Sequence, residues 1–168
     1  MPTQASIART SSSARASERR RAKPQDAIQL LRADHRKVQN LFDQFEKARG
    51  DDRKAALAQE ICTELKVHAQ IEEEIFYPSA REALKEQDLI DEATVEHASA
   101  KELIAQIEQA QAGDELFDAK VIVLGEYIRH HVKEEQNEMF PKLKKTKLDL
   151  KALGEQLAER KEALMAEM

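Results

Sequence analysis

Apolar side chains recur at alternating intervals of three and four residues along successive stretches of this chain. This spacing predicts amphipathic helices, because it places the apolar residues on one face of a 3.6-residue period. The predicted helices cover about residues 24–47, 52–78, 89–111 and 117–141. Because only short turns at Gly50 and Gly113 join helices within the two halves of the chain, we predict an all-α protein built as an up-down-up-down four-helix bundle.

Two prolines and a weaker stripe complete the predicted elements. Proline lacks a backbone donor and clashes with the preceding turn, so Pro78 should bend or end the second helix and Pro141 should stop the fourth. A short helical extension is expected at residues 79–85. Leucines at 150, 153, 157 and 164 predict a further helix. We therefore expect a bundle at residues 24–142 and a C-terminal amphipathic helix within residues 143–168.

Each of the four stripes contains a histidine, and two stripes also contain a glutamate. The histidines are His35, His68, His97 and His131, and the glutamates are Glu72 and Glu135. Each glutamate follows its histidine by four residues, which places both side chains on one helix face. A proline follows ten residues after His68 and ten after His131, so the chain resembles two copies of one unit.

Buried carboxylates indicate the chemistry of such a core. A carboxylate in an apolar interior costs several kcal/mol unless it is paired or bound to a cation. One His-x3-Glu pair alone is typical of a surface ion pair, but its repetition beside two further histidines favours a metal site. Six ligands are few for two octahedral ions, so the glutamates should bridge and leave positions for an oxygen bridge and an exogenous ligand.

Three more side chains are candidates for the surroundings of this site. His130 also has a glutamate four residues later, Glu134, but the phase of the stripe favours His131 as the ligand and leaves His130 on the flank or surface. Tyr77 and Tyr127 are candidates for redox activity or for a hydrogen bond to a bound ligand. Packing is the alternative that we favour for both tyrosines.

Composition and charge limit the remaining possibilities. Charged residues make up 35% of the chain and aromatic residues 4%, which is typical of a helical protein. The single Cys62 excludes an internal disulfide, and neither a membrane-spanning run nor a secretory signal is evident, so we expect a cytoplasmic protein without membrane association.

Residues 1–23 form a basic tail, with six basic residues against one acidic residue, and we expect it to be disordered. Nucleic-acid contact and an organelle transit signal are two possible roles of this tail. We favour a third, a solubilising extension.

The set of histidines and glutamates resembles that of bacterial hemerythrin-like proteins of the HHE cation-binding family, over about residues 24–142. This resemblance implies a four-helix bundle with two iron ions, bridged by an oxo or hydroxo group. One iron would take His35 and His68, the other His97 and His131, and Glu72 and Glu135 would bridge them. Members of the family bind oxygen or act on oxygen, nitric oxide, peroxide or iron.

The chain departs from the invertebrate oxygen carriers of this family at two positions. Lys101 stands where those carriers have a second histidine on the third helix, and Gln136 stands where they have an aspartate. Three functions follow as hypotheses. The first is binding, sensing or sequestration of O2, nitric oxide or iron, and the second is a catalase-like or peroxidase-like enzyme acting on H2O2. The third is a nucleic-acid-associated stress protein that uses the basic tail.

Overall fold

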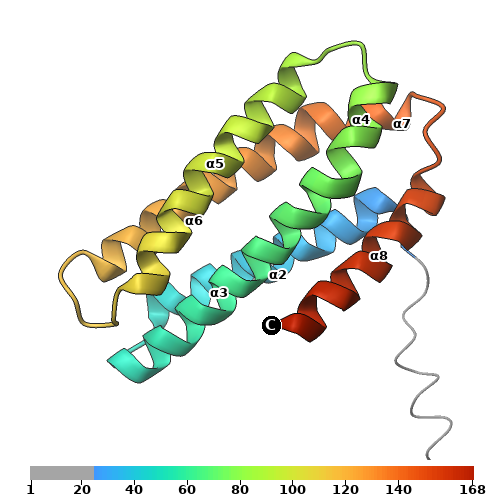
Figure 1. Cartoon of the computed structure of the whole chain (residues 1–168). Helices are drawn as coiled ribbons and strands as arrows, with labels where there is room; N and C mark the ends of the chain where they lie inside the picture. The colour runs from blue at the N-terminus through green and yellow to red at the C-terminus, as the bar shows by residue number, and fades with distance from the viewer. Residues whose placement is uncertain (1–24) are drawn as a thin grey trace, which may run out of the picture.

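The computed structural model describes residues 25–168, and the basic tail expected at residues 1–23 lies outside this range. Four long helices form the body of the molecule (Figure 1), and they are α2 (Ala27–Lys47), α3 (Asp51–Ile71), α5 (Asp88–Gln109) and α6 (Phe117–Glu134). Each packs against two of the others in the ring α2, α3, α5, α6 and back to α2. The predicted up-down-up-down bundle is therefore confirmed.

Capping fixes the start of the bundle. The Asp26 side chain accepts a hydrogen bond of 2.8 Å from the backbone N–H of Gln29, and the Gln29 side chain accepts one of 3.1 Å from the N–H of Asp26. This reciprocal capping box satisfies two N–H groups that lack helical partners, so α2 begins at Ala27.

The helices do not end at the prolines, and the expectation that Pro141 stops the fourth helix is wrong. A π-helical segment, η1 (Glu72–Phe76), follows α3 and continues into α4 (Tyr77–Ala83), while η2 (Glu135–Met139) follows α6 and continues into α7 (Phe140–Lys144). The backbone N–H of Tyr77 bonds to the carbonyl of Glu72, and that of Phe140 bonds to the carbonyl of Glu135. These wider turns, closed five residues back, allow the chain to pass a proline without ending the helix.

The last helix, α8 (Leu150–Glu167), packs against α2, α3 and η1. Figure 1 shows it in red beside the blue start of α2. Three of the four predicted leucines are buried on this helix, namely Leu153, Leu157 and Leu164. The C-terminal amphipathic helix is thus present and covers one end of the bundle.

The apolar core is divided into two clusters by a layer of buried polar groups. One cluster contains the start of α2, the π-helical segments and α8, and the other contains the opposite ends of the four long helices. Cys62 belongs to the second cluster, where burial raises the pKa of its thiol to about 12. In the described part of the chain, no helix combines the length and the apolar composition needed to cross a membrane.

Candidate metal centre

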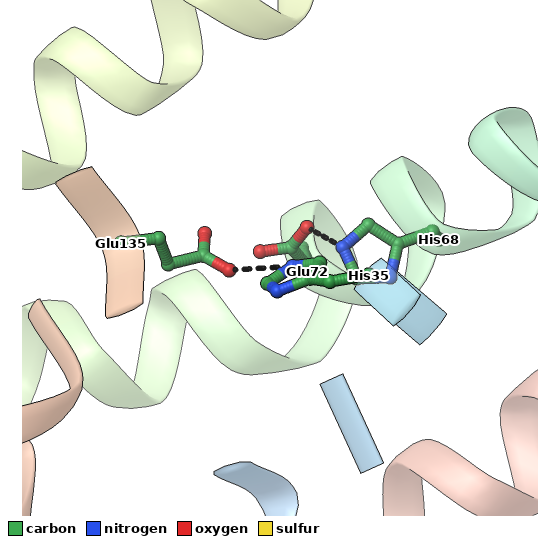
Figure 2. A group of neighbouring side chains, drawn as sticks. All are labelled: His35, His68, Glu72 and Glu135. Atoms are coloured by element: carbon green, nitrogen blue, oxygen red, sulfur yellow. Dashed lines mark ion pairs between the residues drawn. The ribbon is translucent and has the colours of Figure 1, made fainter. Parts of the chain in front are cut away.

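The six predicted ligands meet in the layer between the two clusters. They come from α2 (His35), α3 and η1 (His68, Glu72), α5 (His97), and α6 and η2 (His131, Glu135). All six are buried, with Glu72 0% and Glu135 2% exposed. Figure 2 shows His35, His68, Glu72 and Glu135 pointing toward one another. Helical phase therefore directs each side chain inward, and packing of the four helices brings them together.

Each glutamate lies between one histidine of each half of the chain. Glu135 approaches His35 through one oxygen and His131 through the other, both at 3.3 Å from the Nε2 atoms. An oxygen of Glu72 lies 2.5 Å from Nε2 of His68 and 3.8 Å from Nε2 of His97. The histidines themselves form two pairs, with ring centroids 4.9 Å apart for His35 and His68 and 4.8 Å for His97 and His131.

Several of these buried atoms make ion-pair contacts at most and form no hydrogen bond among the described residues. They are His35 Nε2, His68 Nε2, both oxygens of Glu72, Oε1 of Glu135 and His97 Nδ1. An unsatisfied buried polar group costs about 1–3 kcal/mol, and more when it is charged. The donor set, imidazole nitrogen and carboxylate oxygen, suits a divalent transition metal. Two overlapping groups have the proximity for such an ion: His35, His68, Glu72 and Glu135, and Glu72, His97 and His131.

Without a metal ion, the carboxylates of the layer keep protons on two of the histidines. Burial lowers the pKa of His68, but Glu72 and Asp34 outweigh burial and raise it to about 10. Burial also lowers the pKa of His131, but Glu135 and Glu96 outweigh burial and raise this pKa to about 11. The side chains alone thus hold protons where a metal ion would take the nitrogen lone pairs, so metal binding should displace protons.

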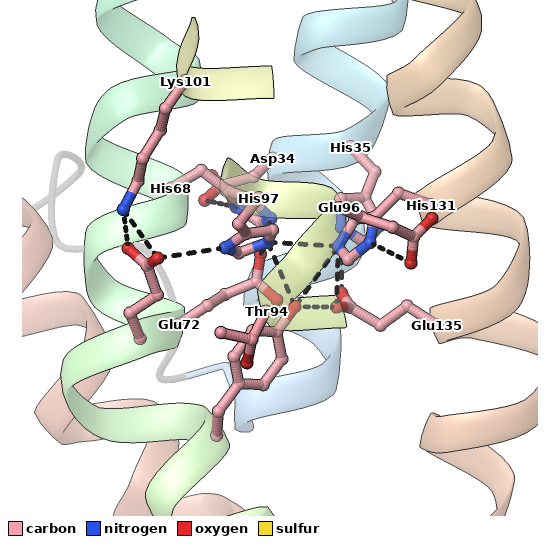
Figure 3. Close-up of polar contacts among 12 residues, drawn as sticks. Asp34, His35, His68, Glu72, Thr94, Glu96, His97, Lys101, His131 and Glu135 are labelled. Atoms are coloured by element: carbon pink, nitrogen blue, oxygen red, sulfur yellow. Dashed lines mark hydrogen bonds and ion pairs between the residues drawn. The ribbon is translucent and has the colours of Figure 1, made fainter. Parts of the chain in front are cut away.

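Three of the four histidines have a hydrogen-bond partner at the outer ring nitrogen, and Figure 3 shows two of these partners, Asp34 beside His68 and Glu96 beside His131. Asp34 lies 2.9 Å from Nδ1 of His68, and Glu96 lies 3.4 Å from Nδ1 of His131. Across the two halves, Gln136 lies 2.7 Å from Nδ1 of His35, whereas Glu73 lies 3.7 Å from Nδ1 of His97, which is too far for a hydrogen bond. Such partners fix the orientation of metal-binding imidazoles and raise their basicity.

These partners were not predicted as part of the site, although the sequence contains a signal for two of them. Asp34 precedes His35 and Glu96 precedes His97, so an acid-His pair occurs once in each half. Each acid serves the histidine of the following long helix rather than its own neighbour. Helical periodicity does not give this pairing, because it depends on which helices pack together.

The residues at which the chain departs from the oxygen carriers both have partners here. Lys101 lies 2.6 Å from both oxygens of Glu73, so it reaches the site only through that carboxylate. Gln136 contacts His35 directly. The structure thus gives Gln136 a role in orienting a histidine and leaves Lys101 outside the layer.

Tyr77 enters the layer, whereas the other two candidate neighbours lie outside it. The Tyr77 hydroxyl donates a hydrogen bond of 2.8 Å to Glu135 and lies 3.2 Å from Nε2 of both His97 and His131. Burial and the nearby carboxylates raise its pKa well above the ordinary value, so the hydroxyl stays protonated. The His130 side chain is 66% exposed and lies 3.1 Å from Glu134, and Tyr127 is 50% exposed.

A cavity of about 610 Å³ opens onto the layer. All four buried histidines line it, together with apolar side chains such as Val38, Ala100 and Ile104, and with Tyr127 and His130. On the other side of the layer, Phe140 stacks on His35 with ring centroids 6.2 Å apart, and Phe76 is fully buried. A small molecule would therefore reach the histidines from the cavity side.

Comparison with known proteins shows which family has a similar sequence and fold. A family model described as the hemerythrin HHE cation binding domain matches residues 26–143. In fold, the chain is similar to the crystal structure of a hemerythrin HHE cation binding domain-containing protein from Mycobacterium kansasii, with a TM-score of 0.73 and 24% identity. That match covers 85% of this chain and 89% of the other.

A further relative, from Nostoc sp., is named a DNA nickase. It is 29% identical over 111 residues, which make up 66% of this chain. The chain spans 31% of that relative's length. Most of the nickase thus lies outside the match, and its name describes that whole protein.

Proposed function

Because the chain belongs to the hemerythrin HHE cation-binding family, we propose that its buried layer holds two iron ions and binds dioxygen or a related small ligand. The buried atoms of Glu72, Glu135, His35 and His68 that face one another without forming hydrogen bonds carry this proposal. Imidazole and carboxylate groups aimed at one another in an apolar interior are stable together when they share cations.

The side chains fit a pair of ions better than a single one. His35 with His68 would hold the first iron, and His97 with His131 would hold the second. Glu135 has one oxygen near each pair, and Glu72 lies near His68 and His97, so each carboxylate is suited to bridge. Di-iron carboxylate sites in other helix bundles use the same residue types projecting inward.

When bound, iron supplies the redox chemistry with O2, nitric oxide or H2O2. The chain's own residues would control access and protons. Apolar side chains of the cavity limit water near the histidines, and Asp34, Glu96 and Gln136 hold the imidazole rings in place. The Tyr77 hydroxyl keeps its proton and donates a hydrogen bond to Oε2 of Glu135, beside the His97 and His131 pair.

Peroxide turnover is a second candidate function, and Tyr77 favours it. The protonated Tyr77 hydroxyl lies within 3.2 Å of two proposed ligands, so it would be the nearest side-chain proton donor for chemistry that iron would supply there with H2O2. Adding H2O2 to the iron-loaded protein and measuring oxygen release tests this candidate. Turnover no faster than that of free iron would remove it.

Metal analysis tests the main proposal. Protein loaded with ferrous iron without oxygen and then desalted should contain about two irons per chain, as in other di-iron bundles. His68→Ala and His131→Ala should each lose at least one of the two, because each removes an imidazole from one of the pairs. His130→Ala is the matched control, since this neighbouring histidine is 66% exposed and should leave the iron content unchanged.

A wild-type protein that retains no iron would contradict the proposal. So would iron that stays bound after both His68→Ala and His131→Ala.

A further inference from the structure

A lysine of the last helix, Lys161 of α8, lies at the edge of the candidate metal centre. Lys161 of α8 forms an ion pair with one oxygen of Asp34, whose other oxygen lies 2.9 Å from Nδ1 of His68. Nε2 of His68 in turn faces Glu72 at 2.5 Å. A continuous line of contacts therefore connects an ammonium group on α8 to a proposed iron ligand, and the family model ends at residue 143, before α8 begins.

The corresponding carboxylate in the second half of the chain has a different environment. Glu96 lies beside Nδ1 of His131, but its side chain is 26% exposed, against 6% for Asp34. Its other neighbour is the exposed His130, at 3.7 Å. The two halves thus repeat the acid and the histidine, while Lys161 neutralises the acid in the first half.

Packing fixes the position of Lys161. Leu157 and Leu164 are buried on either side of it along α8. Gly154 lies so close to the start of α2 that an added Cβ would be 2.3 Å from the carbonyl oxygen of Gln25. An exposed ion pair contributes little, but here the carboxylate is buried, so the charge of Lys161 acts across a poorly screened contact.

We propose that Lys161 is a positioning residue that sets the reduction potential of the iron held by His35 and His68. A carboxylate at the outer nitrogen makes an imidazole a stronger electron donor to a metal. The ammonium group offsets the charge of Asp34, weakens this effect and so favours ferrous over ferric iron at this position. The inference rests on the proposed function and adds α8 to the site.

Substitution of Lys161 tests the inference through the reduction potential. Lys161→Met should keep its iron and shift the potential of one iron to a more negative value. A tenfold change in the ratio of ferric to ferrous affinity corresponds to about 59 mV for one electron. Lys161→Arg, which keeps the charge, should restore the wild-type potential. Spectroelectrochemistry of the iron-loaded protein measures these shifts.

Arg160→Met is the matched control. Arg160 is the neighbouring residue on α8 and pairs with the exposed Glu74 at 2.7 Å, so its loss removes an ion pair of the same helix that does not contact a proposed ligand's partner. It should leave the potential unchanged, even where it lowers the unfolding midpoint. Equal effects of Lys161→Met and Arg160→Met on stability, with no change of potential in either, would show that Lys161 only fastens the helix and would overturn the inference.

Asp34→Asn gives a second, independent measurement. The amide keeps an oxygen near Nδ1 of His68 but removes the negative charge, so the potential should shift in the positive direction, opposite to the shift for Lys161→Met. Shifts of the same sign would overturn the inference. An iron-free wild type would overturn the proposed function and this inference together, whereas iron-loaded Lys161→Met at the wild-type potential would overturn the inference alone.

Discussion

Tyr77 brings a hydroxyl group into a buried layer of imidazoles and carboxylates. The sequence favours packing as the role of this side chain, and the residue is indeed 4% exposed and lies beside Phe76. A buried tyrosine hydroxyl also needs a partner, and here it donates to Glu135. Packing and hydrogen bonding therefore act together at this residue.

Removal of the Tyr77 hydroxyl should destabilise the iron-free protein. Tyr77→Phe removes the hydroxyl that donates to the buried Glu135, and a hydrogen bond to a charged group contributes about 1.5–3 kcal/mol. Urea unfolding measures the loss. Tyr127→Phe is the control, because Tyr127 is 50% exposed and should change the stability little. Equal stability of both variants would contradict a role for the hydroxyl.

The two π-helical segments decide which residues face the metal centre. In an α-helix, a residue five positions after Glu72 would point away from the glutamate. In η1 the five-residue turn brings Tyr77 back above Glu72, and in η2 it does the same for Phe140 above Glu135. The halves are thus equivalent in backbone but differ in chemistry, because only the first half supplies a hydroxyl at this position.

The docking of α8 depends on a glycine. Gly154→Ala would place a Cβ 2.3 Å from the carbonyl oxygen of Gln25 and 2.8 Å from the nitrogen of Ala27. Alanine normally favours a helix over glycine, so any loss of stability must come from this clash, and overpacking costs about 1–3 kcal/mol. Urea unfolding and limited proteolysis of α8 measure the effect.

Glu155, the exposed residue that follows Gly154, provides the control substitution. Glu155→Ala removes a solvent-facing side chain on the same helix and should leave both stability and protease resistance nearly unchanged. Stability of Gly154→Ala equal to or above the wild type would mean that α8 can shift without cost.

At the scale of the whole molecule, the polar layer and the cavity together define a one-sided site. Phe76, Phe140 and α8 cover one side of the layer, and the cavity of about 610 Å³ leads to the other. Ligand pockets in proteins commonly have volumes in this range. The bundle thus encloses the carboxylates completely while it leaves the histidine rings within reach of a small molecule.

Filling this cavity should weaken ligand binding without removing iron. Ala100 lines the cavity one helical turn from His97, and Ala100→Phe would occupy part of it. Azide binding to the ferric protein, followed by visible spectroscopy, should weaken by about tenfold, which corresponds to about 1.4 kcal/mol. Ala105→Phe, at an exposed position of the same helix, should bind azide normally. Unchanged azide binding in Ala100→Phe would mean that ligands enter by another route.

The sequence alone determined the helices, the stripes and the six proposed ligands. These features are local: helical periodicity assigns His35, His97 and the two His-x3-Glu pairs to inward faces whatever the neighbouring helices do. The duplicated acid-His pairs were visible too, but their partners were not. Tertiary structure decided those, because Asp34 reaches His68, Gln136 reaches His35 and Lys161 reaches Asp34 only after different helices have packed.

The sequence also did not predict the backbone conformation beside the two prolines, Pro78 and Pro141. Their spacing indicated a repeat, but the backbone beside them could not be predicted, because a π-turn depends on how the helix is held on both sides as well as on the proline. That register then decides that Tyr77 faces Glu135. Periodicity therefore determined which residues could meet at the centre, and packing across helices decided which partner, charge and hydroxyl each of them finds.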